Sequence, residues 1–274
     1  MKDIKEITEQ LEQGVKEVFN SERYREYLDT MSKFYQYSAN NCMLIMMQKP
    51  EATMIASYKQ WQKDFKRQVK KGEHAIRILA PVTHKYTKEV VMEDGTKEDR
   101  EGQWISYMGV PVFDISQTEG EPLPTLVDRL TGTVEEYNSL LIKLVSCSPV
   151  PVEYEDIQTT ANGYYNSMDN RIAIRTGMSQ QQTIKTLVHE IAHSMLHSKD
   201  GEESEADKHT KEVQAESVAY TVCKWLGIDT SGYSFGYVAG WSGNKDVKQL
   251  TASMEVIRKT AKAIIDAINE KEVK

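Results

Sequence analysis

The sequence His-Glu-Ile-Ala-His at residues 189–193 lies inside a segment whose apolar residues recur at helical spacing. A capping box at residues 179–182 predicts where this helix begins. At 3.6 residues per turn, His189 and His193 leave the same side of the helix one turn apart, so both imidazoles can reach one metal ion. Glu190 lies beside them, where a carboxylate can take a proton from water. The stretch therefore predicts a catalytic metal site on a helix.

A third protein ligand is expected from the next helix, predicted over residues 205–225. Catalytic zinc takes three protein ligands and keeps one position open, and two histidines with a glutamate suit zinc. Glu212 and Glu216 are four residues apart and share a face, so one can bind the ion while the other receives the N–H of a ligand histidine. We assign Glu212 to the metal and Glu216 to the histidine; the reverse stays open. His197 would move away from the ion on an unbroken helix, which favours a supporting or solvated position.

The composition of the chain limits the classes of protein to which it can belong. Among 274 residues, 27% are charged and 39% hydrophobic, as in globular proteins. The chain has no apolar signal core and no apolar run long enough to cross a bilayer, so we expect a cytoplasmic protein without membrane contact. Three scattered cysteines predict reduced thiols rather than disulfides. The formal charge of −7 is uneven, because residues 1–90 hold 16 Lys and Arg against 12 Asp and Glu, which predicts two regions with different partners.

A basic segment follows Ser57, where we expect a helix over residues 58–69. Basic side chains can follow a phosphate backbone while flat rings stack on unpaired bases, and single-strand binding uses this combination. The alternative is a solvated basic face with the aromatic residues in the core. The candidate DNA-binding residues are Lys59, Trp61, Lys63, Lys66, Arg67, Lys70 and Lys71.

The chain divides at residues 117–124, where a glycine and two prolines predict a linker. Before it, four helices precede a strand at residues 75–82 and a long hairpin at 85–115 with an Asp-Gly turn at 94–95. After it, short strands precede the metal-bearing helices and a final helix. We therefore expect an α+β fold of two domains, helical with a β-hairpin at residues 1–120, and with a small sheet and the His-Glu-x-x-His helix at 121–274.

Several sequence motifs that occur in a fixed order identify a protein family more specifically than any single motif. These motifs lie at residues 37–41, 58–61, 70–73, 78–82, 112–118, 189–197 and 212–220. Together they resemble the ArdC-type antirestriction proteins of mobile elements, in which a single-stranded-DNA-binding domain precedes a zincin-like metallopeptidase domain. The resemblance implies DNA binding by residues 1 to about 120. It also implies Zn²⁺ on His189, His193 and a glutamate of the following helix, with Glu190 catalytic. The Glu-x-x-Ala-Glu order is similar to zincins whose first glutamate is the ligand, which favours Glu212.

These observations predict a zinc-dependent metalloendopeptidase that reaches protein targets on exposed single strands during conjugative transfer, with activity that is latent or DNA-dependent. One alternative is a non-catalytic protein that protects incoming single-stranded DNA and holds a structural zinc. Another is a regulatory metallopeptidase that cleaves a repressor without needing DNA. The group that would stabilise the oxyanion stays open among four residues, Tyr164, His209, Tyr220 and Tyr233.

Overall fold

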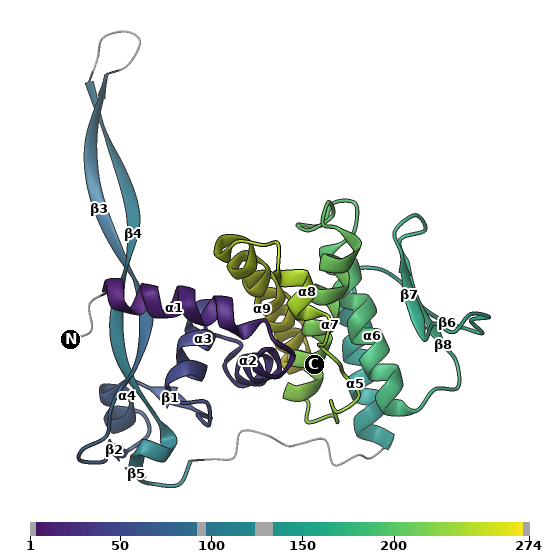
Figure 1. Cartoon of the computed structure of the whole chain (residues 1–274), viewed down its shortest axis with the longest axis horizontal. Coiled ribbons are helices and arrows are strands. Elements are labelled where there is room, and N and C mark those ends of the chain that lie inside the picture. Colours follow the sequence, from purple (N-terminus) through teal and green to yellow (C-terminus); the bar gives the residue numbers. More distant parts are fainter. Residues whose placement is uncertain (1–3, 92–96, 124–133, 271–274) are drawn as a thin grey trace.

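A computed structural model describes residues 4–91, 97–123 and 134–270, and Figure 1 shows how its helices and sheets are arranged. The α+β fold expected from the sequence is confirmed. In the described part of the chain, no helix combines the length and apolar character needed to span a membrane. The first half contains α1 (Ile4–Val18), α2 (Ser21–Phe34), α3 (Ala39–Gln48), β1 (Ile55–Ala56), α4 (Tyr58–Lys63), β2 (Arg67–Val69), β3 (Ile76–Val91), β4 (Lys97–Asp114), a 3₁₀ turn (Ile115–Gln117) and β5 (Thr118–Gly120). The second half contains α5 (Val134–Cys147), β6 (Val152–Glu155), β7 (Gly163–Asn166), β8 (Arg171–Arg175), α6 (Gln180–Leu196), α7 (Lys208–Trp225), α8 (Val238–Ser242) and α9 (Val247–Asn269).

The N-terminal helices pack directly against the helices of the second half. The Tyr24 hydroxyl in α2 lies 2.9 Å from Oγ of Ser217 in α7, and both groups are buried. The Tyr220 hydroxyl donates to Oδ1 of Asp29 over 2.7 Å. Farther along, Oε2 of Glu255 in α9 accepts the backbone N–H at the start of α3. Apolar residues of both halves form one hydrophobic cluster, so α1 to α3 complete the core around α7 and α9. The division near residue 120 stays a prediction.

A long β-hairpin dominates the outline of the molecule (Figure 1). Where the sequence predicted a strand at 75–82 followed by a separate hairpin, β3 is continuous and pairs antiparallel with β4 from Ile76–Val112 to Val91–Lys97. Near its base Ile76, Ile78 and Val112 are buried, whereas the outer part extends away from the helices. The predicted Asp-Gly turn at residues 94–95 lies outside the described residues.

The helix predicted over residues 58–69 is wrong after Lys63. A capping box between Ser57 and Gln60 starts α4 as expected, but Lys66 has a positive φ of 51°, which an α-helix does not allow. The next three residues form β2, which pairs with β5. The predicted linker therefore begins too early, because residues 118–120 are part of a small sheet, and its last residue lies outside the described chain.

In the second half, a three-stranded sheet with the order β6-β8-β7 lies beside α6. Its central strand β8 buries Ile172 and Ile174, while β7 pairs with β8 on one side only and forms the edge next to α6. The helix expected to begin at residue 205 begins at Lys208, because the Asp207 carboxylate accepts the backbone N–H of Thr210 and caps it.

Candidate metal centre and nucleic-acid interface

Two packed helices, α6 and α7, carry the predicted metal ligands. Ser179 caps α6 by accepting the backbone N–H of Gln182, and the buried apolar side of the helix fixes its rotation against the core. His189 and His193 therefore leave the same side, and their Nε2 atoms are 3.1 Å apart. Both rings are partly exposed, so they are accessible from one side of the molecule.

Glu212 of α7 completes a group of three potential ligands with these histidines. Its Oε2 atom lies 3.6 Å from Nε2 of His189 and 3.7 Å from Nε2 of His193. An ion with tetrahedral bonds of about 2.0–2.2 Å separates neighbouring ligand atoms by roughly 3.3–3.6 Å. The three side chains therefore fit one shared divalent cation.

Glu216 lies one turn farther along α7 and contacts the other nitrogen of His189. Its Oε2 is 3.4 Å from Nδ1 of His189, so the carboxylate can accept the N–H that leaves Nε2 available as a ligand atom. The structure thus brings Glu212 toward the two Nε2 atoms and Glu216 to the far side of one ring.

His197 makes a hydrogen bond to the ring of His193, the other histidine ligand. Its Nδ1 lies 2.9 Å from Nδ1 of His193, and its Nε2 lies 2.9 Å from Oε1 of Gln214. Only one set of tautomers satisfies this chain with Nε2 of His193 left for a metal: His193 donates to His197, which donates to Gln214. Burial holds the pKa of His197 down, at about 4, so the ring stays neutral and can accept this bond.

Electrostatics within the cluster favour a bound cation. Burial works against a charged His189, but hydrogen bonds with Glu212 and Glu216 outweigh it and raise the pKa of His189 to about 10. Hydrogen bonds from His189 and His193 hold the pKa of the Glu212 carboxyl well below its usual value. The site therefore retains anionic oxygen and attracts a positive charge, which a proton or a metal ion can supply.

Glu190 lies beside the two ligand histidines in α6 and reaches the edge strand β7. It is only 7% exposed, and its carboxylate accepts the backbone N–H of Tyr165 in β7. Burial raises the pKa of this carboxyl above its usual value, which makes the anion a stronger base than an exposed glutamate.

A cleft of about 520 Å³ opens beside these groups. The metal-ligand cluster and Glu190 form one wall, and residues 163–165 of β7 form another. Two lysines of α7, Lys208 and Lys211, also line it. A peptide could therefore lie between the edge strand and the metal ligands.

The hydroxyls of the three tyrosines considered for oxyanion stabilisation are engaged elsewhere. Tyr164 donates to Glu155, Tyr220 to Asp29 and Tyr233 to the Cys223 thiol. The contacts of Tyr220 and Tyr233 lie in the helical core and neither residue lines the cleft, whereas Tyr164 does line it, with its hydroxyl bonded to Glu155.

His209, the fourth candidate, lies on α7 one turn before Glu212. Its ring contacts Tyr237, with centroids 5.7 Å apart. Burial raises the pKa of Tyr237, and the negative charges of Glu216 and Glu212 add to the effect.

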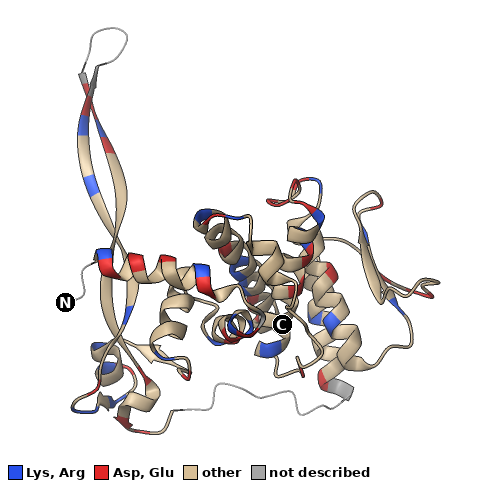
Figure 2. Ribbon diagram, viewed as in Figure 1, with Lys and Arg blue, Asp and Glu red and all other residues tan. Residues whose placement is uncertain are grey.

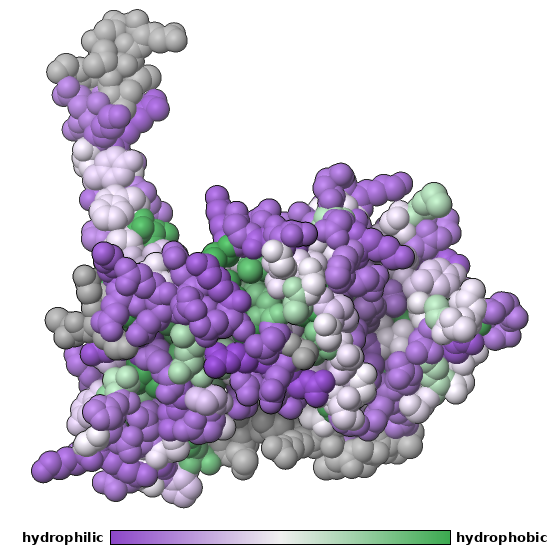
Figure 3. All heavy atoms as spheres, viewed as in Figure 1, coloured by the Kyte–Doolittle hydropathy of each residue, from purple (hydrophilic) through white to green (hydrophobic). Residues whose placement is uncertain are grey.

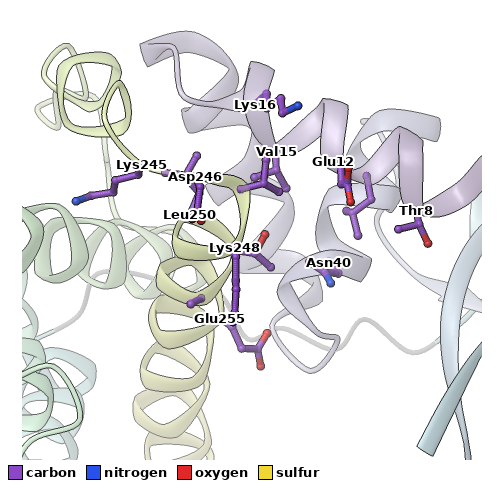
Figure 4. A pocket seen from close by; sticks show the side chains of 14 residues that line it. Thr8, Glu12, Val15, Lys16, Asn40, Lys245, Asp246, Lys248, Leu250 and Glu255 are labelled. Atoms are coloured by element: carbon purple, nitrogen blue, oxygen red, sulfur yellow. The ribbon is translucent and has the colours of Figure 1, made fainter.

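A larger hollow of about 910 Å³ lies between α1 and the first turns of α9 (Figure 4). Lysines and acidic residues of both helices alternate around it, among them Lys16, Lys248 and Glu12. The metal-ligand group found among the described residues is in the smaller cleft, so we place the chemistry there despite its smaller volume.

The predicted DNA-binding cations gather around α4 and β2, at the base of the hairpin (Figure 2). Two of them make hydrogen bonds within the fold. Arg67 donates to Thr118 and to backbone carbonyls of β5, and Lys70 donates to the Ser116 carbonyl. Lys66 lies 4.0 Å from Glu121. The remaining three, Lys59, Lys63 and Lys71, are exposed.

Trp61 does not fit its predicted role in base stacking. Its side chain is 0% exposed, and the indole N–H donates to the Phe113 carbonyl over 2.8 Å. Phe65 packs against the same ring. The alternative considered for this residue is therefore correct: Trp61 anchors α4 to β4 and offers no face to a base.

Comparison with protein families agrees with this two-part organisation. Residues 3–113 match the N-terminal domain of anti-restriction factor ArdC, and residues 145–234 match the IrrE N-terminal-like domain of the Peptidase_M78 family. The chain joins an ArdC N-terminal domain to a Peptidase_M78 domain. The ArdC-type motifs at residues 189–197 and 212–220 lie in the second match.

Three similar proteins show low sequence identity to this chain. An uncharacterized protein of Bacillus anthracis is 29% identical over 98% of the chain, and the chain spans about half (52%) of that protein's length. The metal-free crystal structure of antirestriction protein ArdC from plasmid R388 is 20% identical, with a TM-score of 0.52 over 85% of each chain. Its Mn(II)-bound structure is 18% identical, with a TM-score of 0.51 over 86% of each. The likeness to these structures shows a shared fold.

Proposed function

We propose that the chain is a zinc-dependent metallopeptidase that acts on proteins at single-stranded DNA, as an antirestriction factor during transfer of a mobile element. The observation that carries the peptidase part is the convergence of two imidazoles and the Glu212 carboxylate beside the buried Glu190. The match of residues 3–113 to the ArdC N-terminal domain supports the DNA part. The exposed lysines at the base of the hairpin agree with it.

A divalent ion held by His189, His193 and Glu212 would polarise a peptide carbonyl and lower the pKa of a nearby water. Glu190 would accept the proton from that water, and the N–H of Tyr165 would keep its carboxylate in place. Glu216 and His197 would hold the two ligand rings in the required tautomers.

Zinc is the proposed metal because its usual ligand sets include two histidines with one glutamate. The Mn(II)-bound structure of ArdC from plasmid R388 supports a divalent ion in general. Since His197 bonds to His193, it is not available as a fourth ligand. Three protein ligands leave a position for substrate, which supports a catalytic rather than a structural ion.

The test compares the purified wild-type chain with Glu190→Gln, each loaded with zinc, on a labelled protein mixture with single-stranded DNA, duplex DNA or none. We expect cleavage by the wild type, strongest with single strands, and none by the variant, which should bind as much zinc as the wild type. Loss of zinc from the variant would give Glu190 a different role.

The same experiment separates the alternatives. If DNA is protected from nuclease equally by the wild type and Glu190→Gln, and neither cleaves protein, the chain is a protective binding protein. If the wild type cleaves a target equally with and without DNA, it is a stand-alone regulatory peptidase.

A further inference from the structure

The outer stem of the β3–β4 hairpin carries large exposed side chains with no helix packed over them (Figures 1 and 3). Trp104 is 52% exposed and Tyr107 is 59% exposed, and Tyr86, Ile105 and Met108 are exposed to a similar degree. Such a concentration on one protruding element marks an interaction surface.

The strand register divides these side chains between two faces. Residues opposite each other in an antiparallel pair share a face, and successive residues alternate. His84 pairs with Trp104 and Tyr86 with Gly102, so the three rings share what we call the ring face. Tyr107 and Ile105 lie on the opposite face.

The rings on the ring face are held in place by contacts within the hairpin. The His84 and Trp104 rings stack with centroids 4.1 Å apart and planes 14° apart, and Nε2 of His84 is 2.7 Å from Oγ of Ser106. The Tyr86 ring lies across Gly102, where a Cβ would come within 2.5 Å of it. Gly102 therefore gives Tyr86 room to lie across the neighbouring strand.

Charge also differs between the two faces of the stem. Beyond the rings, the ring face carries two cations, Lys88 and Arg100, against one acid, Glu98, which lies 3.7 Å from Arg100. By the strand register, the opposite face carries two cations, Lys85 and Lys97, against three acids at positions 89, 99 and 101. An anionic ligand therefore approaches the ring face more favourably.

We propose that the ring face is a stacking site for unpaired bases of single-stranded nucleic acid, with Trp104 and Tyr86 as the platforms. The proposal rests on the proposed function of the N-terminal half and extends its DNA contact from the lysines of α4 and β2 onto the hairpin stem. Flat exposed rings with nearby cations suit bases and phosphates without reading a sequence. The stem replaces Trp61, which is buried, as the source of stacking rings.

The two contacts differ in their response to salt. Lysines that neutralise phosphates release counterions, so their removal flattens the dependence of affinity on salt. Stacking on a ring releases none, so its loss weakens binding without changing that slope. The ring face and the basic region can therefore be tested separately in one full-length protein.

The experiment measures anisotropy of a fluorescent, unstructured single-stranded oligonucleotide across a salt series for the wild type, Trp104→Ala and Tyr107→Ala. Tyr107 is the matched control, because it is equally exposed on the same strand but on the opposite face. We expect Trp104→Ala to weaken binding roughly 5- to 100-fold at unchanged salt slope. Tyr107→Ala should bind as the wild type does, and Lys59→Ala with Lys63→Ala should flatten the slope.

Intrinsic fluorescence gives a second readout. Of the four tryptophans, Trp61 and Trp241 are buried and Trp225 is partly buried against the core beside Tyr35, so quenching on DNA binding should come mainly from Trp104. Trp104→Phe, which keeps a flat ring, should retain most of the affinity and lose most of the quenching.

The outcomes are distinguishable. If the wild type binds single strands and Trp104→Ala binds equally well, the ring face is not a DNA contact, while the proposed function stands. If both alanine variants weaken binding equally, the face assignment is wrong. If the wild type binds no single strands even at low salt, the DNA part of the proposed function fails as well, and the stem would be a protein-binding surface.

Discussion

Nδ1 of His197 lies 2.9 Å from Nδ1 of His193, so a proposed metal ligand is oriented by a second, neutral histidine on the same helix. Metal-ligand histidines usually donate to a carboxylate or a carbonyl, and loss of such a partner lowers metal affinity about 10- to 100-fold. We expect His197→Ala to weaken zinc binding by that factor in competition with a chromogenic chelator. His209→Ala is the control, because that exposed ring contacts Tyr237 instead. Equal affinity in the wild type and both variants would remove His197 from the metal centre.

The assignment of the two glutamates can be tested by truncating each. Glu212→Ala removes the oxygen that lies nearest both Nε2 atoms, so zinc should be lost at micromolar protein concentration. Glu216→Ala removes only the partner of His189 Nδ1 and should weaken binding about 10- to 100-fold. Metal content after dialysis, measured by atomic emission, separates them. The opposite ranking would make Glu216 the ligand.

Zinc affinity should rise with pH. In the metal-free protein the pKa of His189 is raised to about 10, so the ring holds a proton near neutral pH that the metal must displace. Binding therefore releases this proton, and affinity should rise about tenfold per pH unit from neutral toward pH 10. Calorimetry in buffers of different ionisation enthalpy measures the protons released. A pH-independent affinity between pH 7 and 9 would show that His189 is already neutral.

Substitution of Trp61 should change the free energy of unfolding far more than it changes DNA binding. Removing a fully buried indole costs about 3–5 kcal/mol of unfolding free energy, so Trp61→Ala should lower the denaturant midpoint strongly. Trp61→Phe keeps most of the packing and loses the hydrogen bond to the Phe113 carbonyl, which contributes about 1 kcal/mol. A Trp61→Phe protein that is fully folded but no longer binds DNA would reinstate Trp61 as a contact.

The second half should not fold well by itself. A fragment of residues 121–274 lacks α2, which covers Ser217 and Tyr220 on the buried side of α7. We expect this fragment to aggregate or to bind a dye for exposed apolar surface, whereas the full chain does neither. A fragment that is monomeric, cooperatively folded and zinc-binding would contradict the shared core.

Local signals were enough to predict which side chains lie together in the candidate metal centre. The spacing of His189 and His193 fixes their direction on any straight helix, and the four-residue step from Glu212 to Glu216 does the same on the next. The pairing of His197 with Gln214 could not be read in this way, because it depends on how closely α6 and α7 pack.

The basic segment shows where periodicity misleads. Its lysines and rings suit a helix, yet Lys66 turns the chain and the following residues pair with β5, some fifty residues away. Propensity was overridden by a long-range strand pair, which a single sequence does not reveal. The ring face could not be predicted for the same reason, because the pairing of Tyr86 with Gly102 can be recognised only once the strand register is known.

The packing of α2 on α7 also bears on how such chains can be recombined. A graft that joined the metal-bearing half to another nucleic-acid reader at residue 120 would strip the tyrosine, aspartate and apolar partners from the back of α7. A graft made after β1, which ends at Ala56, would keep these partners and would exchange only the hairpin and the basic region at its base. The part of this architecture that can be exchanged without uncovering α7 is therefore the segment between β1 and α5, because α1 to α3 share one core with the metal-bearing helices.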